Sequence, residues 1–257
     1  MDSELRERAI SSNNVSDRYT GNQTFGKHDF SAWSKNLIDG LHFTRVLDIC
    51  CGTGNQLVLY AGKPGVTDIW GVDLSQESLD RASERIKDTA ADVHLVCSDI
   101  DVFFDTLDSD ATFDLISCFY GLYYSEDTPK LLGKMQEHLD QDGRILIVGP
   151  YGKNNTNLFE IIERYCPIPE AVVWGSNHYM EKEVFPCLET SCIVEQKEFV
   201  NEIEYPGAGD VIKYWQASTF YSAAHEKEVE EDLEKEFAEN GTFIVEKHVK
   251  AYIAKKK

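Results

Sequence analysis

A chain of 257 residues with 42% hydrophobic and 27% charged residues has enough apolar side chains to bury a substantial core. No segment approaches the ~20 apolar residues of a membrane span, and residues 1–12 lack the apolar run of a secretion signal, so we expect a soluble, cytoplasmic protein that does not bind membranes. Its 45 acidic and 25 basic residues give a net charge of −20, which repels phosphates and argues against a nucleic-acid partner.

The cysteine pattern excludes two further classes of protein. The seven cysteines form no C-x-x-C pair, and the His residues are not grouped near them at the spacing of zinc ligands. We therefore expect neither a metal site nor a disulfide framework.

From residue 45 to residue 150, short β-branched runs alternate with longer amphipathic segments, which is the pattern of βαβ units. Strands are predicted at residues 45–49, 68–72, 93–97, 115–119 and 144–148. The segments between them predict helices at residues 56–61, 76–88, near Val102 and at 128–139. Right-handed crossovers between these strands would give an open α/β sheet that is doubly wound, mostly parallel and Rossmann-like.

Beyond Pro150 the pattern changes. Helices are predicted at residues 157–165, 209–217 and 229–240. Residues 192–205 and 242–254 alternate as strands do, and we expect them to pair as an antiparallel C-terminal edge of a seven-stranded sheet. The helices between them would form a helical cap over the carboxyl ends of the strands. We predict one domain over residues 1–257, with an N-terminal segment at 1–36, a core at 37–150, and the cap and sheet edge at 151–257.

A tight turn follows the first predicted strand, with the sequence Asp48-Ile49-Cys50-Cys51-Gly52-Thr53-Gly54. Glycines let the backbone approach a ligand closely, and the start of the following helix offers free N–H groups. A nicotinamide enzyme would ordinarily carry G-x-G-x-x-G here, where a pyrophosphate binds. Because Asp48 would repel a pyrophosphate, the turn favours a cofactor that carries ammonium and sulfonium groups.

Acidic residues also end the next two strands. Asp73 comes about 20 residues after the turn, where a carboxylate can accept hydrogen bonds from both hydroxyls of a ribose. It could instead cap the helix at 76–88, although Ser75 can fill that role. Asp99 could accept from an adenine amino group or could be a solvated loop acid. Three acids at successive strand ends favour one ligand site at this edge of the sheet.

Together with Phe113-Asp114-Leu115-Ile116-Ser117 and Gly143-Arg144-Ile145-Leu146-Ile147, these segments resemble the ordered motifs of class I S-adenosylmethionine-dependent methyltransferases over roughly residues 37–150. The similarity is strongest to the small-molecule branch that includes ubiquinone and menaquinone C-methyltransferases. The resemblance implies that S-adenosylmethionine is bound by Asp48, Cys50, Gly52, Gly54, Asn55, Asp73, Leu74, Asp99, Ile100 and Phe119. It places Asp48 near the methionine part, Asp73 on the ribose, and Phe119 near the sulfonium.

Two positions depart from the family pattern. Cys50 stands where a glycine is usual, so we expect a turn with less room. Tyr123 and Tyr124 stand near the place where relatives often carry His, and tyrosine is a poor base but a good hydrogen-bond partner. The catalytic candidates are Tyr19, Tyr123, Tyr124 and His178, with His28 and Tyr205 as further possibilities. Residues of these types are more often structural or on the surface, and that alternative stays open for each of them.

Methyl transfer from a sulfonium is an in-line displacement, so alignment and exclusion of water can supply much of the rate. The sequence therefore predicts an S-adenosylmethionine-dependent methyltransferase with a small-molecule acceptor. We expect aromatic residues between 159 and 221 to line the acceptor pocket and the aromatic-rich segment 19–33 to form a lid, or simply to pack as a helix. The alternatives are a cofactor-binding regulatory or interaction protein of the same fold and a protein methyltransferase.

Overall fold

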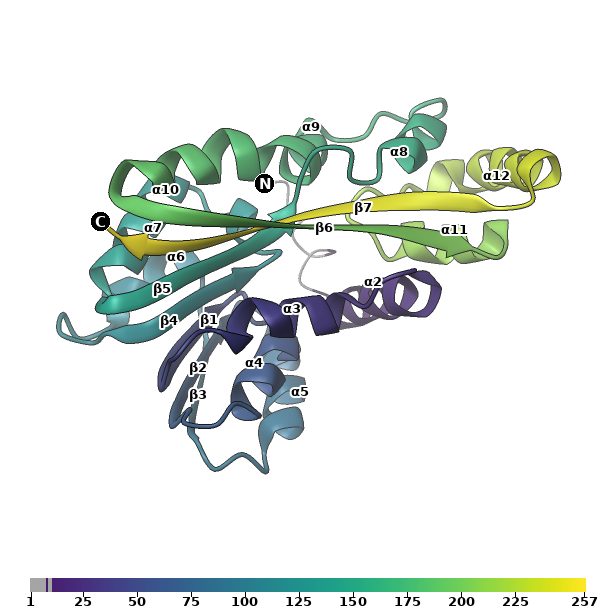
Figure 1. The fold of residues 1–257 in the computed structure, drawn as a ribbon. Coiled ribbons are helices and arrows are strands. Elements are labelled where there is room, and N and C mark those ends of the chain that lie inside the picture. The colour runs from purple at the N-terminus through teal and green to yellow at the C-terminus, as the bar shows by residue number, and fades with distance from the viewer. Residues whose placement is uncertain (1–7, 9–10) are drawn as a thin grey trace. The chain divides into compact units, whose positions relative to one another are not determined.

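The computed structural model describes residue 8 and residues 11–257. Its strands form one seven-stranded sheet in the order β3-β2-β1-β4-β5-β7-β6 (Figure 1). The chain divides into two compact units. Unit 1 comprises the described part of Met1–Trp33 together with Pro150–His178 and Phe199–Val249, and unit 2 comprises Ser34–Gly149, Tyr179–Glu198 and Lys250–Lys257. The strands β6 and β7 contribute residues to both units.

Unit 2 contains the parallel part of the sheet, in which β1 pairs with β2 and β4, β2 with β3, and β4 with β5. Its strands are β1 (Arg45–Ile49), β2 (Asp68–Asp73), β3 (Asp92–Cys97), β4 (Phe113–Phe119) and most of β5 (Leu139–Pro150). Its helical elements are most of α3 (Phe30–Asp39), α4 (Asn55–Ala61), α5 (Gln76–Ile86), α6 (Ile100–Phe103), η1 (Phe104–Thr106), η2 (Leu122–Tyr124), α7 (Thr128–Glu137), η4 (Met180–Val184) and α10 (Phe185–Ser191).

Unit 1 has a hydrophobic core of its own, in which Leu158, Ile203, Trp215 and Leu233 are fully buried. Its helical elements are α2 (Ser12–Phe25), α8 (Thr156–Ile162), α9 (Glu170–Val173), η3 (Trp174–His178), α11 (Ala208–Gln216), η5 (Ala223–His225) and α12 (Glu226–Asn240). The strands β6 (Cys192–Tyr205) and β7 (Phe243–Lys256) run through both units and form the antiparallel C-terminal edge.

Burial explains why the sequence of unit 2 folds in this way. The central strands β1 and β4 are buried along almost their whole length, as expected for parallel strands covered by helices on both faces. The helix α5 is capped at its N-terminus by Ser75, whose hydroxyl accepts the N–H of Ser78, and it buries Leu79 and Ala82. In Figure 1, α4 and α5 lie together against the β1–β2 side of this sheet. The two helices therefore form the connections that follow β1 and β2 in the chain.

The predicted fold class is confirmed, and each predicted strand is present within a few residues. The helical predictions need adjustment. The helix predicted at 128–139 ends at Glu137, because Leu139 begins β5 and pairs with Phe113. The helical stretch from Glu170 to Ser191 was not predicted. The prediction of one domain over residues 1–257 stays a prediction, although the chain passes from unit 2 to unit 1 at Gly149 and Pro150, next to the expected division.

Candidate cofactor and active site

The turn between β1 and α4 has an unusual backbone. Cys50, Gly52 and Gly54 all have positive φ angles, of 54°, 53° and 79°. The turn is fixed to β2 by two hydrogen bonds, since the N–H of Cys51 donates to the carbonyl of Val72 over 3.0 Å and the N–H of Gly52 donates to the Asp73 carboxylate over 2.8 Å. A left-handed backbone at three positions gives a compact turn whose shape depends on glycine at two of them.

The two glycines face different surroundings. A Cβ added to Gly52 would meet no heavy atom of the described residues within 4 Å, so the backbone there borders open space. A Cβ added to Gly54 would lie 2.9 Å from the Cβ of Ala82 on α5, so that glycine serves helix packing. The turn is therefore open at Gly52, and the predicted cofactor contacts of both glycines stay predictions.

Asp73 is the last residue of β2, and two backbone N–H groups hold its carboxylate in place. One oxygen accepts the N–H of Gly52, and the other accepts the N–H of Ser75 over 2.9 Å. Burial raises the pKa of this carboxyl, and the backbone hydrogen bonds oppose that rise. Each carboxylate oxygen keeps a further lone pair, so the group is oriented and can still accept from a vicinal diol.

Asp48 is buried in β1, with 1% of its surface exposed. One carboxylate oxygen accepts the hydroxyl of Ser117 over 2.6 Å, and Ser117 in turn accepts the hydroxyl of Tyr60 over 2.8 Å. The other oxygen, Oδ2, has no hydrogen-bond partner among the described residues. Burial raises the pKa of this carboxyl to about 7, against an opposing effect of the Ser117 hydrogen bond, and the charge of Asp73 raises it further.

The departure from the family pattern at Cys50 is accommodated by Gly121. A Cβ at Gly121 would lie 2.2 Å from the Cβ of Cys50, which means that only glycine leaves room for this side chain. The sulfur of Cys118, near the end of β4, borders the same space, 3.4 Å from the position of that added Cβ. The side chain is therefore packed between Gly121 and Cys118, and the expected loss of room in the turn is offset on that side.

The remaining predicted cofactor residues lie at or after the ends of β1, β2, β3 and β4. Asn55 begins α4, and its side-chain oxygen accepts from Arg85 of α5, which also donates to the carbonyl of Thr53. Leu74 is partly exposed after β2. Asp99 is the N-cap of α6 and accepts the N–H of Asp101, and its predicted contact with adenine stays a prediction. Ile100 and Phe119 are both buried.

These residues fit S-adenosylmethionine on three observations. Asp48 offers an unpartnered buried oxygen to a cation, the Gly52 backbone borders open space, and Asp73 presents an oriented carboxylate. A buried acceptor without a donor is costly, and a cationic ligand would relieve that cost. All three residues belong to unit 2.

The four catalytic candidates fall in different units. Tyr123 and Tyr124 lie in η2 of unit 2, half-buried, with their ring centroids 4.7 Å apart. The turn that carries them is held by Tyr179, whose hydroxyl donates to the carbonyl of Leu122 over 3.0 Å. Tyr19 in α2 and His178 in η3 belong to unit 1. Whether any of the four reaches an acceptor stays a prediction.

Several aromatic residues expected in the acceptor pocket pack instead in the core of unit 1. Tyr205, Tyr214 and Trp215 are all buried there, and the indole of Trp215 donates to the carbonyl of Phe220. Trp174 and His178 are exposed and in ring contact. The core-packing explanation therefore accounts for the first three, and the cap role of residues 151–257 stays a prediction.

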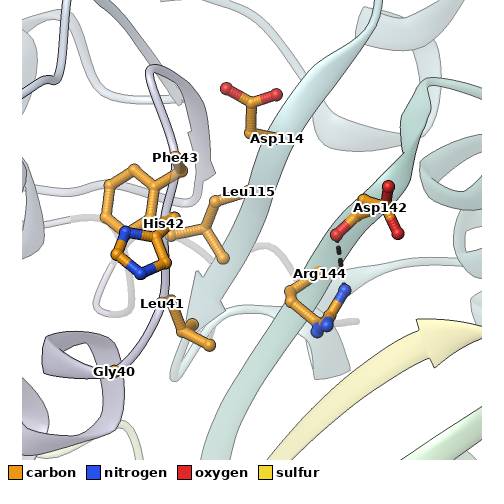
Figure 2. Close-up of a pocket in the computed structure, with 8 residues that line it drawn as sticks. All are labelled: Gly40, Leu41, His42, Phe43, Asp114, Leu115, Asp142 and Arg144. Atoms are coloured by element: carbon orange, nitrogen blue, oxygen red, sulfur yellow. Dashed lines mark hydrogen bonds between the residues drawn. The ribbon is translucent and has the colours of Figure 1, made fainter.

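A pocket opens at the other end of the parallel strands (Figure 2). It is lined by Gly40, Leu41, His42, Phe43, Asp114, Leu115, Asp142 and Arg144. The Asp114 carboxylate in its wall accepts three hydrogen bonds, from the N–H and hydroxyl of Thr44 and the N–H of Arg45. This acid is satisfied by the protein itself, in contrast to Asp48.

Sequence reasoning missed the residues that support the site from other elements. Ser117 and Tyr60 complete the hydrogen-bond chain of Asp48, Arg85 fixes the turn, and Gly121 receives the side chain of Cys50. A small polar residue within the apolar strand β4 was the available signal for Ser117. The other partners are set by tertiary contacts. Within the described residues, no cluster of three or more His, Cys, Asp or Glu is placed to hold a metal ion, and no helix has the length and apolar character needed to cross a bilayer.

Comparison with known proteins gives the context of this geometry. Residues 46–143 match a family model described as a methyltransferase domain. A demethylmenaquinone methyltransferase of Leptospira interrogans is 25% identical over 206 residues, which cover 74% of this chain and 81% of that protein. The crystal structure of the YcgJ protein from Bacillus subtilis aligns with a TM-score of 0.60 at 20% identity, over 88% of this chain and 98% of that one. The plantazolicin methyltransferase BpumL, solved in complex with SAH, aligns with a TM-score of 0.53 at 15% identity, over 100% and 91% of the two chains.

Proposed function

Because this chain belongs to the class I S-adenosylmethionine-dependent methyltransferases, we propose that it methylates a ring carbon of a small hydroxylated aromatic acceptor of the naphthohydroquinone type. The cofactor assignment depends above all on the unpartnered carboxylate oxygen of Asp48 beside the turn. The acceptor class is supported by the similarity to a demethylmenaquinone methyltransferase, which covers most of both chains.

The cofactor supplies an electrophilic methyl group on a sulfonium. In the proposal, Asp73 binds the two ribose hydroxyls, and the backbone at Gly52 leaves room for the cofactor to lie against the turn. The ionised Asp48 carboxylate attracts its cationic part. The other predicted contacts, at Cys50, Gly54, Asn55, Leu74, Asp99, Ile100 and Phe119, complete the proposed site.

On the acceptor side, the proposal uses Tyr123 and Tyr124. A phenolic hydroxyl both donates and accepts hydrogen bonds, so it can orient an acceptor oxygen and keep the reacting carbon in line with the methyl group. The hydrogen bond from Tyr179 to Leu122 fixes the turn that carries both rings. These tyrosines would position the acceptor, because a hydroquinone ring is activated by its own oxygen. Tyr19 and His178 remain further candidates.

The test is a transfer assay with S-adenosylmethionine labelled in its methyl group. The acceptor panel contains a short-chain 1,4-naphthohydroquinone without a ring methyl group, a simple phenol, phosphatidylethanolamine vesicles and a set of peptides. We expect label on the naphthohydroquinone ring carbon, and a loss of at least tenfold in kcat/KM for Tyr123→Phe with unchanged cofactor affinity. Label only on peptides would favour the protein methyltransferase alternative. Cofactor binding with no transfer to any acceptor would favour the regulatory alternative.

The proposal also includes the setting of the reaction. With a net charge of −20 the chain repels phosphate backbones, which supports a small-molecule acceptor over a nucleic acid. All seven cysteines, which lie in the described part of the chain, are free. Free thiols are typical of a reducing compartment and support the cytoplasm as its location.

A further inference from the structure

Two thiols meet beside the cofactor turn. Cys118 pairs in register with Ile49 across the parallel strands β1 and β4, and Cys50 is the next residue after Ile49. Neighbouring strands lie about 4.8 Å apart, so the backbones of Cys50 and Cys118 are at the separation that a disulfide spans.

The side chains of this pair point toward each other. A Cβ built on Gly121 would lie 2.5 Å from the sulfur of Cys50 and 3.4 Å from the sulfur of Cys118, so both sulfur atoms border the same small space. Cys118 is also the neighbour that most raises the pKa of the Cys50 thiol, in agreement with the closeness of the two sulfurs. Cys51, by contrast, has its sulfur 3.1 Å from the corresponding point at Gly71 on β2. Of the two consecutive cysteines, only Cys50 faces Cys118.

We propose that Cys50 and Cys118 form a reversible disulfide under peroxide and that this cross-link opposes cofactor binding. Cys50 belongs to the turn that we assign to the cofactor, and the turn is fixed on its other side to β2 through Cys51 and Gly52. Bringing the sulfur of Cys50 from its present separation to the roughly 2.05 Å of an S–S bond with Cys118 pulls the turn toward β4. A shift of this kind disturbs the geometry on which cofactor contacts depend.

The chemistry uses hydrogen peroxide as the oxidant. Cys50, which is partly exposed, attacks one peroxide oxygen as a thiolate, the O–O bond breaks, and the departing hydroxide takes up a proton to give water. Cys50 is then a sulfenic acid. The buried Cys118 attacks its sulfur, the S–O bond breaks, and the leaving hydroxide takes the thiol proton as a second water. Two thiols and one peroxide thus give one disulfide and two waters, and two electrons pass from sulfur to oxygen.

The rate of the reaction follows from the surroundings of Cys50. The neighbouring Cys118 and burial both raise the pKa of the Cys50 thiol, so little thiolate is present at neutral pH. Oxidation is therefore slow, and it needs hours in excess peroxide. Coupling between two equilibria is reciprocal. If the cross-link weakens cofactor binding, then bound cofactor must disfavour formation of the cross-link.

The experiment treats the full chain with hydrogen peroxide for several hours, with and without saturating S-adenosylhomocysteine. Free thiols are then alkylated and the cross-linked peptides are identified by mass spectrometry. Affinity for S-adenosylhomocysteine is measured by calorimetry before oxidation, after it, and after reduction with dithiothreitol. We expect a Cys50–Cys118 cross-link, affinity at least tenfold weaker in the oxidised protein and restored by reduction, and slower cross-linking in the presence of S-adenosylhomocysteine.

Two variants make the result specific. Cys118→Ala removes the partner thiol outside the proposed cofactor contacts, so it should bind S-adenosylhomocysteine normally, form no cross-link and keep its affinity through peroxide treatment. Cys51→Ala should still form the cross-link, which assigns it to Cys50. The absence of the cross-link, an unchanged affinity in the cross-linked protein, or an equal loss of affinity in Cys118→Ala would each overturn the proposal. None of these readouts uses an acceptor, so they are independent of the proposed quinol substrate.

Discussion

At the scale of single residues, Asp48 is in an environment that disfavours its charge. The carboxyl is almost fully buried, and one of its oxygens has no partner among the described residues. Its pKa of about 7 in the folded protein lies above the usual 3.8, so folding favours the protonated form. The stability that this preference gives is complete below about pH 4 and is lost as pH rises to 7 and above.

Replacing Asp48 by asparagine should remove this pH dependence. The asparagine side chain would keep an oxygen for the hydroxyl of Ser117 and would carry no charge at any pH. We expect Asp48→Asn to be more stable than the unsubstituted chain by about 2–4 kcal/mol at pH 8 and to differ little from it at pH 4. Urea unfolding of both proteins at the two pH values measures the difference. An equal effect of the substitution at pH 4 and pH 8 would show that Asp48 does not titrate in this range.

The same carboxyl should link cofactor affinity to pH. A cationic cofactor favours the ionised form of Asp48, so binding at pH 6 must first remove a proton. We expect the affinity for S-adenosylmethionine to rise by up to about tenfold per pH unit between pH 6 and pH 7 and to level off above pH 7. The cofactor's own amino group titrates near pH 8, and Asp48→Asn provides the correction, because it retains only that contribution. Identical pH profiles for the two proteins would rule out a contact of the cofactor with Asp48.

At the scale of elements, the turn between β1 and α4 contains two glycines with different roles, one open to a ligand and one packed against a helix. Gly52 borders open space and Gly54 touches α5, although both have positive φ. Gly52→Ala should cost only about 1 kcal/mol of stability from backbone strain, yet it should weaken cofactor binding at least tenfold. Gly54→Ala should cost more stability, because its Cβ meets Ala82. Urea unfolding and calorimetry on the two variants decide this, and the assignment fails if Gly52→Ala binds normally.

The elements also show what a sequence can reveal about this fold. Strands β1 and β4 were predictable because they are buried along almost their whole length, and Asp48, Asp73 and Asp99 were predictable as site acids because each lies at or just after the end of a predicted strand. The start of β5 was not, because Leu139 continues the helical spacing of α7 and pairs with Phe113 only in the folded sheet. The π-helical turns near residues 174–184 have no signal at a period of 3.6.

The residues of the candidate site also divide into those that the sequence could predict and those that it could not. The acids and glycines of the turn were predictable because they are local in sequence. The partners of Asp48 were not, since Ser117 lies 69 residues from Asp48 and 57 from Tyr60. Contacts of such sequence separation depend on strand order, which a local pattern does not specify. For the same reason, the aromatic residues of unit 1 were assigned to a pocket when three of them belong to a core.

At the scale of the whole molecule, the net charge makes a prediction of its own. With 45 acidic and 25 basic residues, the chain should not be retained on DNA or RNA, because binding to a polyanion requires basic residues to replace its counterions. A column of immobilised DNA at physiological salt tests this, with a basic protein of similar size as the positive control. Retention that weakens with added salt would mean that a local basic surface outweighs the overall charge, and it would reopen a nucleic-acid acceptor.

The parallel sheet of unit 2 has two unlike ends. At the carboxyl ends of β1 and β2, Asp73 is anchored beside an open turn. At the amino ends, Asp114 accepts three hydrogen bonds from Thr44 and Arg45 in the wall of the pocket in Figure 2. Both carboxylates hold backbone N–H groups in place, so replacing either one costs stability. Only Asp73 is assigned to the cofactor, which makes the pair a matched comparison.

Calorimetry of S-adenosylhomocysteine binding to the unsubstituted chain, Asp73→Ala and Asp114→Ala tests the cofactor assignment most directly. Loss of the proposed ribose hydrogen bonds should cost Asp73→Ala about 2–4 kcal/mol, which is a loss of affinity of about 30-fold or more. Asp114→Ala should be destabilised by about 1–3 kcal/mol in urea unfolding and should bind as the unsubstituted chain does. Unchanged affinity in Asp73→Ala, or an equal loss in both variants, would contradict a cofactor site at the carboxyl ends of these strands.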